Sequence, residues 1–198
     1  MRLRFNLLVV FVALALGQCF AGGRLIEKPL RVQNVEGELF AGVTAPLGLY
    51  GGKSAAGFGL GIEVRRNFKS TGWDVGGQIS MMSAEHRYHN PHFADDPERR
   101  DHYYGQSNMT FSFMAVGDYN FRQGRRVNPF AGAGFGFAER HSDKALGPGP
   151  EGIGIAFMPR IGVELWSHLR VSASFYVAGK GNNCFALTIG GVIGGRKK

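Results

Sequence analysis

Two segments in the middle of the chain alternate between apolar and polar side chains and are joined by a short basic turn. In residues 107–121 the large apolar side chains occupy odd positions, while Asn, Thr, Ser and Asp occupy even ones. In residues 127–138 Ala and Phe alternate with Gly in the same way. A period of two indicates a β-strand with one apolar face. The stretch from Ser107 to Ala138 therefore predicts a hairpin of two long strands.

Six further segments show the same alternation: residues 38–50, 57–68, 73–82, 152–166, 169–177 and 185–193. With the hairpin, the predicted strands number eight. The connections after the second, fourth and sixth strands are short, and the two longest connections, at Glu85–Gly105 and His141–Pro150, both follow odd-numbered strands. We read both of these as irregular surface loops. An up-and-down meander explains this alternation and places both ends of the barrel domain beside the short turns.

The composition of the two strand faces indicates which one is outside. A soluble barrel needs a water-facing set rich in Lys, Glu and Gln, but here the set opposite the apolar one is mostly Gly, Ser, Thr and Ala. Trp73, Tyr119, Phe121, Phe130 and Trp166 lie near the short turns, and Tyr50, Phe58, Tyr103 and Tyr104 near the other rim. Aromatic girdles at two membrane interfaces have this distribution. The sequence thus predicts an all-β fold: a closed, eight-stranded, antiparallel up-and-down transmembrane barrel.

The N-terminus has the pattern of an export signal. Arg2 and Arg4 precede an apolar run at 7–17, which is too short to span a bilayer, and Ala21 is a plausible cleavage position. We expect residues 1–21 to be a signal peptide, 22–35 a periplasmic tether and 36–198 the outer-membrane barrel. Lipidation at Cys19 is the alternative to cleavage. If Cys19 leaves with the leader, Cys184 is the one remaining cysteine and no internal disulfide forms.

Basic residues exceed acidic ones, for a formal net charge of +8. Removal of the leader takes away two arginines and no acid, which lowers this charge from +8 to +6. These bases are dispersed among turns and termini in an exported chain, so we expect no nucleic-acid partner. Solvated turns, with some contact to lipopolysaccharide or phosphate, explain them.

Several motifs are similar to those of a known family. The segment NPFAGAGFG at 128–136 resembles the strand pattern P-[FY]-x-G-x-G-x-G, and PRIGVE at 159–164 and the glycine-plus-base ending at 190–198 are also similar. Together they resemble the small eight-stranded outer-membrane barrels of Gram-negative bacteria, the OmpA transmembrane-domain and OmpX-like superfamily. The resemblance implies contacts with outer-membrane lipid, lipopolysaccharide and the barrel-insertion machinery. Many members end in an aromatic residue, whereas this chain ends in Lys198.

If the apolar faces meet lipid, eight charged side chains fall on the lumenal faces: Glu38, Glu63, Arg65, Asp74, Asp118, Arg160, Glu164 and Arg170. An eight-stranded barrel is nearly filled by its side chains, and buried charges must pair. We therefore expect a lumenal ion-pair network that plugs the barrel, with Arg160 and Arg170 as its main bases. The other interpretation places several of these side chains in water at the rims.

Two chemical alternatives are weaker. The first is a metal site in the long loop, where His86, His89, His92 and His102 accompany Asp95, Asp96 and Asp101. An irregular loop fixes no common face for such ligands, so we assign no metal and no cofactor. The second is a lipid A-modifying enzyme, for which the adjacent His141 and Ser142 are the candidate pair. Both lie in an expected loop with no nearby strand acid at a suitable spacing, so we expect no catalysis. A structural, envelope-maintaining or adhesive role remains, with a soluble ligand-binding barrel as a further alternative.

Overall fold

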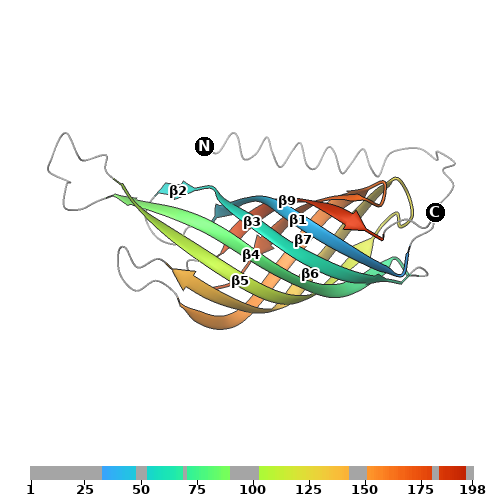
Figure 1. Cartoon of the computed structure of the whole chain (residues 1–198), viewed down its shortest axis with the longest axis horizontal. Coiled ribbons are helices and arrows are strands. Elements are labelled where there is room, and N and C mark those ends of the chain that lie inside the picture. Colours follow the sequence, from blue (N-terminus) through green and yellow to red (C-terminus); the bar gives the residue numbers. More distant parts are fainter. Residues whose placement is uncertain are drawn as a thin grey trace.

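The chain forms a single antiparallel sheet that closes on itself (Figure 1). The computed structural model describes residues 33–47, 53–68, 71–89, 103–142, 151–179 and 183–194. Its strands are β1 (Val35–Pro46), β2 (Lys53–Ala55), β3 (Gly57–Asn67), β4 (Trp73–His89), β5 (Tyr103–Asn120), β6 (Val127–Ser142), β7 (Gly152–Leu165), β8 (Leu169–Tyr176) and β9 (Cys184–Ile193). Among the described residues, no helix is long and apolar enough to cross a membrane.

The barrel wall has eight strands, as the sequence predicts, because β2 and β3 together form one of them. β2 and β3 are separated by one residue and pair with β4 in succession. The register shifts by one residue between Ala55↔Glu85 and Gly59↔Met82, which marks a β-bulge within that one strand. β1 pairs with β9, and β4 with β5, so the meander closes. A closed sheet leaves no row of unpaired backbone groups.

The two ends of the barrel differ. The short connections from β3 to β4, from β5 to β6 and from β7 to β8 lie at one end, which we name the short-turn end. Gly72 and Gly124 have positive φ there, and so do Trp166 and Ser167, the first two residues of the three-residue turn. β1 begins and β9 ends at this same end, as expected: the Asn67 amide donates to the Asn34 carbonyl, and the Val192 amide donates to that of His168. The opposite end is the long-loop end.

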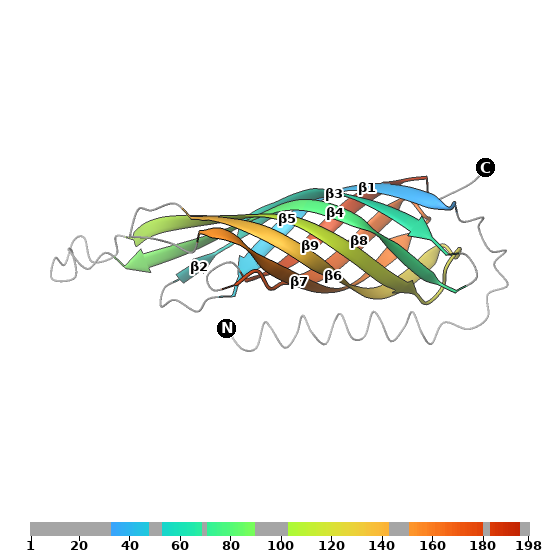
Figure 2. The same ribbon diagram turned by 90° about the horizontal axis from the view of Figure 1, so that it is seen from below.

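One expected loop is shorter than predicted. Residues 85–89 and 103–105 belong to β4 and β5, which pair as far as Tyr88↔Tyr104 and His89↔Tyr103. These two strands project beyond the others at the long-loop end (Figures 1 and 2). The sequence misled us because this segment is polar on both faces. The hydrogen bonds between antiparallel strands are made by backbone groups. The β4–β5 hairpin can therefore continue beyond the apolar zone whatever side chains it carries. β6 likewise extends to Ser142.

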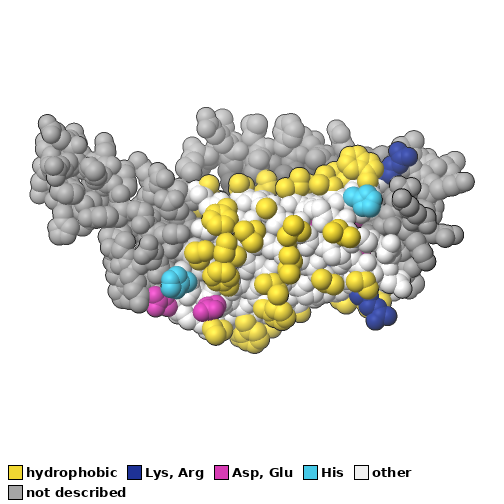
Figure 3. Space-filling view, viewed as in Figure 1, with side chains coloured by type: hydrophobic (Ala, Val, Ile, Leu, Met, Phe, Trp, Pro, Cys, Tyr) yellow, Lys and Arg dark blue, Asp and Glu magenta, His cyan; other side chains and the backbone are white. Residues whose placement is uncertain are grey.

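The apolar faces of the strands point outward. Leu39 on β1, Phe113 on β5 and Ile155 on β7 are 66%, 63% and 67% exposed, and the large apolar side chains of the other long strands follow them. On the face shown in Figure 3, hydrophobic side chains lie over the middle and charged ones lie near the two ends. This is the inverse of a water-soluble barrel and is the surface of a barrel in lipid.

One of the aromatic residues predicted for the belt at the short-turn end lies elsewhere. Trp73, Tyr119 and Phe121 are exposed and stack edge to face, with ring centroids 5.2 Å apart at each step. Phe130, expected among them, is only 2% exposed and lies in the lumen. Its position has the same parity as Gly132, a lumenal residue of the same strand, so the alternation itself turns the ring inward.

Candidate functional site in the barrel lumen

The structure brings all eight predicted charged residues into the lumen. They come from six strands (β1, β3, β4, β5, β7 and β8), and each is at most 7% exposed. Period-two alternation explains their common direction, because each lies on the face opposite the exposed apolar row of its strand. Closure of the barrel then faces them toward one another, and none of them lies at a solvated rim.

Arg160 on β7 holds two carboxylates at once. Its Nε and NH2 atoms donate to the two oxygens of Asp118, at 2.8 and 2.7 Å. Its NH1 and NH2 atoms donate to the two oxygens of Glu63, at 2.5 and 2.8 Å. NH1 also donates to Gln78 at 3.1 Å. Such paired, charge-assisted bonds are the strongest hydrogen bonds available to a guanidinium group.

Arg65 on β3 contacts the largest number of acids. Its NH1 atom lies 2.5 Å from Glu38 and 3.0 Å from Glu63. Three further carboxylates surround it at longer range: Glu36 at 3.4 Å, Glu164 at 3.7 Å and Asp74 at 3.9 Å. The sequence favoured Arg160 and Arg170 as the main bases, because neighbouring strands are evident along the chain. It gave no indication that Arg65 lies at the meeting point of five acids.

Arg170 on β8 completes the set of bases. It pairs with Asp118 through NH2, and it lies 3.7 Å from Glu38 and 3.9 Å from Glu164. Its guanidinium carbon is 3.5 Å from the centroid of the Phe130 ring, a cation–π contact. The ring therefore covers one face of the guanidinium group while carboxylates occupy its edge.

Glycine on two strands provides the space for these acids. A Cβ atom at Gly132 on β6 would overlap the carboxylate and backbone of Asp118. A Cβ atom at Gly190 on β9 would overlap the side chain of Glu38. Gly132 and Gly190 thus leave the space that the network occupies.

A sixth carboxylate was missed. Glu36 is 4% exposed, and it pairs with Arg65 of β3 at the start of β1. The sequence pattern predicts a first strand that begins at Glu38, although Glu36 has the same parity and carries the same signal. With Glu36, the buried charged side chains of the described lumen are six acids and three arginines, an excess of three negative charges.

Neutral side chains fill the lumen toward the long-loop end. Gln78 donates to the Tyr176 hydroxyl at 2.7 Å, and the hydroxyls of Ser80 and Ser112 lie 2.7 Å apart. Buried Met82, Met114, Met158 and Ala186 pack around them, and buried Thr44, Asn108 and Thr110 follow toward the long-loop end. A cavity beside Arg160 and Tyr176 offers about 10 Å³ to the centre of a water molecule, space for about one water. In the described part of the barrel, the lumen is a packed interior.

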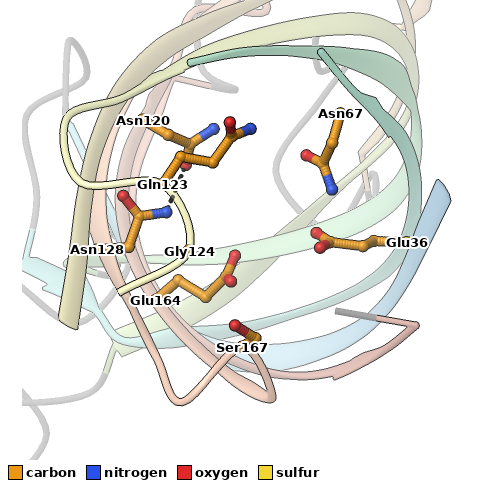
Figure 4. A pocket seen from close by; sticks show the side chains of 8 residues that line it. All are labelled: Glu36, Asn67, Asn120, Gln123, Gly124, Asn128, Glu164 and Ser167. Carbon is orange, nitrogen blue, oxygen red and sulfur yellow. Dashed lines mark hydrogen bonds between the residues drawn. The ribbon is translucent and has the colours of Figure 1, made fainter. Parts of the chain in front are cut away.

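A second small cavity opens at the short-turn end (Figure 4). The carboxylates of Glu36 and Glu164, the hydroxyl of Ser167 and four carboxamides from Asn and Gln residues line it. It too offers about 10 Å³. Glu36 and Glu164 belong both to this cavity and to the charge network, through their contacts with Arg65.

Most side chains of the two chemical alternatives lie outside the described part of the chain. The side chains of the histidine-rich segment, residues 86–102, lie outside the described residues. His141 is exposed at the end of β6, and the side chain of Ser142 is not described. In the described part of the chain, no three His, Cys, Asp or Glu side chains gather as metal ligands. Cys184 is buried as a free thiol.

Comparison with known proteins supports the fold. No protein-family model and no curated protein sequence matches the chain. Among solved structures, Neisserial surface protein A (NspA) matches with a TM-score of 0.55 and 15% identity, over 83% of this chain and 99% of that one. Ail, the attachment invasion locus protein of Yersinia pestis, in complex with the heparin analogue sucrose octasulfate, matches with a TM-score of 0.50 and 14% identity, over 81% and 99%. At these identities the likeness establishes the fold alone: that of the small eight-stranded outer-membrane barrels.

The outer membrane enzyme PagL matches more loosely, with a TM-score of 0.41 and 20% identity over 80% of this chain and 98% of that one. A match at this level does not bear on the chemistry of this chain.

Proposed function

We propose that this chain is an outer-membrane barrel that conducts no solutes and has a structural, envelope-maintaining or adhesive role. The single observation that supports this best is the inverted distribution of side chains: apolar residues face outward, and a packed ion-pair network fills the lumen. The network would act as a rigid plug. A barrel of this kind serves as an anchor, and its contacts are made at its ends.

The proposed orientation places the short turns in the periplasm and the long-loop end outside the cell. The predicted signal peptide and tether support it, because the chain would then enter its first strand from the periplasm. Arg122, Arg125 and Arg126, in the β5–β6 turn, would face the periplasm. The proposed partners are outer-membrane lipid and lipopolysaccharide along the wall, the insertion machinery during assembly, and an extracellular partner at the long-loop end.

The main alternatives fit less well. A soluble ligand-binding barrel would need a polar exterior and an interior cavity, yet the exterior is apolar and each of the two lumenal cavities holds about one water. An enzyme would need a nucleophile and a base in contact, and the described residues supply no such pair with its acid. We therefore propose no catalytic activity.

Electrophoretic heat-modifiability of the membrane-fraction protein tests the barrel in its membrane. The unboiled barrel should migrate differently from the boiled chain, and it should be found in the outer-membrane fraction. Equal migration, or recovery in the soluble fraction, would contradict the proposal. Lipid A mass spectrometry on a deletion strain separates an anchor from an enzyme, since an altered acylation pattern would support the enzyme.

A further inference from the structure

The apolar outer wall of the barrel is hollowed where β6, β7, β8 and β9 lie side by side. The hollow has a volume of about 370 Å³, whereas each of the two lumenal cavities has room for about one water. Its outward-facing lining combines small and large side chains: Ala131, Pro159, Ala173, Ile161, Phe175 and Phe185. Small side chains between large ones leave a depression in the wall.

The lining of the hollow is apolar on its outward face. Its three other residues, Gly132, Arg160 and Ser174, belong to the lumenal faces of their strands, and Arg160 uses its guanidinium group inside the barrel. An unfilled hollow loses the dispersion contacts on one side of each lining atom. Hydrocarbon therefore suits this space, because a flexible apolar chain makes those contacts and needs no hydrogen-bond partner.

A basic and aromatic cluster lies at the short-turn end of the same strands. Arg126 precedes β6, and Trp166 and His168 lie in the connection from β7 to β8. The Trp166 amide donates to the Arg126 carbonyl at 2.7 Å, so the two connections are in contact. All three residues are exposed. A guanidinium group binds phosphate oxygens through paired hydrogen bonds, and Trp is typical of the membrane–water interface. The cluster is therefore suited to a lipid headgroup.

The outer surface of the described chain has its exposed arginines and its exposed acids at opposite ends. Arg66 and Arg126 are exposed at the short-turn end, where the acids among the described residues are buried in the lumen. Glu139 and Glu151 are exposed at the long-loop end, and Arg140 beside them is half-buried. Figure 3 shows this separation on one face, with Lys and Arg side chains at the short-turn end and Asp and Glu side chains at the other. Such a surface favours an anionic partner at the short-turn end.

The spacing between the cluster and the hollow fits one lipid molecule. Ile161, the lining residue of β7 nearest the short-turn end, lies five residues before Trp166. At about 3.3 Å per residue and a strand tilt of about 40°, this separation corresponds to a depth of roughly 13 Å. The hydrocarbon of one leaflet, half of the bilayer core, is roughly 15 Å thick. An acyl chain whose headgroup lies at Arg126 and Trp166 therefore reaches the hollow.

We propose that the β6–β9 wall binds one anionic phospholipid, with its phosphate at Arg126, Trp166 and His168 and an acyl chain in the hollow. The inference rests on the proposed function, because it requires the short-turn end to lie in the periplasmic leaflet, which consists of phospholipid. A second copy of the chain suits this wall less well. In a two-fold pair the same basic end of each copy would meet its equivalent, and like charges repel.

The test is native mass spectrometry of the mature chain, folded in detergent micelles and titrated with lipid. Wild type should retain one long-chain phosphatidylglycerol, more tightly than phosphatidylcholine with the same chains and more tightly than a short-chain phosphatidylglycerol. Arg126→Gln should weaken retention roughly fivefold, the contribution of one base close to an anionic membrane surface. Ala173→Phe, which places a ring in the hollow, should weaken retention at least as much.

Each variant has a matched control. Arg66→Gln removes an exposed base at the same end of the barrel, on β3, which lies across the barrel from β7. Ala41→Phe adds the same ring at an exposed alanine of β1 that does not line the hollow. Both controls should retain phosphatidylglycerol like wild type.

Several outcomes would overturn the lipid site. Loss of retention in R66Q equal to that in R126Q would make the effect one of general charge, and wild-type retention in A173F would leave the hollow without an acyl chain. A dimer that A173F dissociates would assign the hollow to a second copy. If a variant fails to fold, wild type decides, since equal retention of phosphatidylglycerol and phosphatidylcholine refutes the site. A heat-modifiable barrel that retains no lipid refutes this inference alone, whereas a chain without heat-modifiability refutes the proposed function.

Discussion

The side chain of Arg160 donates two parallel hydrogen bonds to Asp118, from Nε to Oδ1 at 2.8 Å and from NH2 to Oδ2 at 2.7 Å. Arg160→Ala removes these bonds and those to Glu63, and leaves two buried carboxylates underpaired. We expect a loss of about 3–5 kcal/mol in the free energy of unfolding, measured by urea titration in lipid vesicles. Arg66→Ala, at an exposed site on β3, is the control and should cost less than about 0.5 kcal/mol. An unchanged unfolding curve for Arg160→Ala would refute a stabilising network.

The lumenal glycines give a paired prediction on one strand. Gly190→Ala should destabilise the barrel by about 1–3 kcal/mol, because its methyl group would overlap Glu38. At the adjacent Gly191 an added Cβ meets nothing within 4 Å. Gly191→Ala should therefore be neutral or stabilising by up to about 1 kcal/mol. Equal effects of the two changes would contradict the lumenal packing, and thermal unfolding in micelles measures both.

The lipid-facing wall predicts a cost for charge that depends on depth. Phe113, in the middle of β5, is 63% exposed, and Ile193, at the end of β9, is 79% exposed. Phe113→Arg should cost about 2–4 kcal/mol in a bilayer, and Ile193→Arg about 0–1 kcal/mol. Refolding yield and urea stability in vesicles measure the difference. Equal losses of stability for Phe113→Arg and Ile193→Arg would show that this wall does not face lipid.

Cys184 provides a probe of the filled lumen. Its thiol is buried at the long-loop end of the lumen, and the residue is 2% exposed. In protein that begins after residue 21, a maleimide should leave the folded barrel unlabelled and should label the chain fully after boiling in detergent. Rapid labelling of the unboiled barrel would show that the lumen admits solutes. An Ile193→Cys variant, exposed outside, controls for reagent activity.

The packed lumen also predicts the electrical behaviour of the protein. Since the cavity beside Arg160 and Tyr176 offers space for about one water, wild type should show no steady ion current in planar bilayers. A wide porin, reconstituted in the same way, is the positive control. Stepwise, long-lived openings by the wild-type protein would contradict the proposed plug.

The architecture could be predicted from the sequence because it depends on regularities within single strands and connections. Alternation along one strand depends only on the backbone pleat, so the outward direction of Phe113 and the inward direction of Asp118 were both readable. The alternating lengths of the connections predicted the meander and the end of the barrel at which β1 begins and β9 ends. The bounds of β4 and β5 were not readable, because the residues beyond the apolar zone carry no periodic signal.

The identity of the ion pairs was decided by the tertiary structure. Parity alone places Phe130 and Arg160 in the lumen, but it does not say that Phe130 stacks on Arg170 or that Arg160 reaches Glu63, 97 positions away. Such contacts depend on strand tilt and on closure of the sheet between β1 and β9. The sequence by itself determined which side chains point inward. Only the closed barrel decided which of them meet, because pairing across a lumen is a property of three-dimensional geometry.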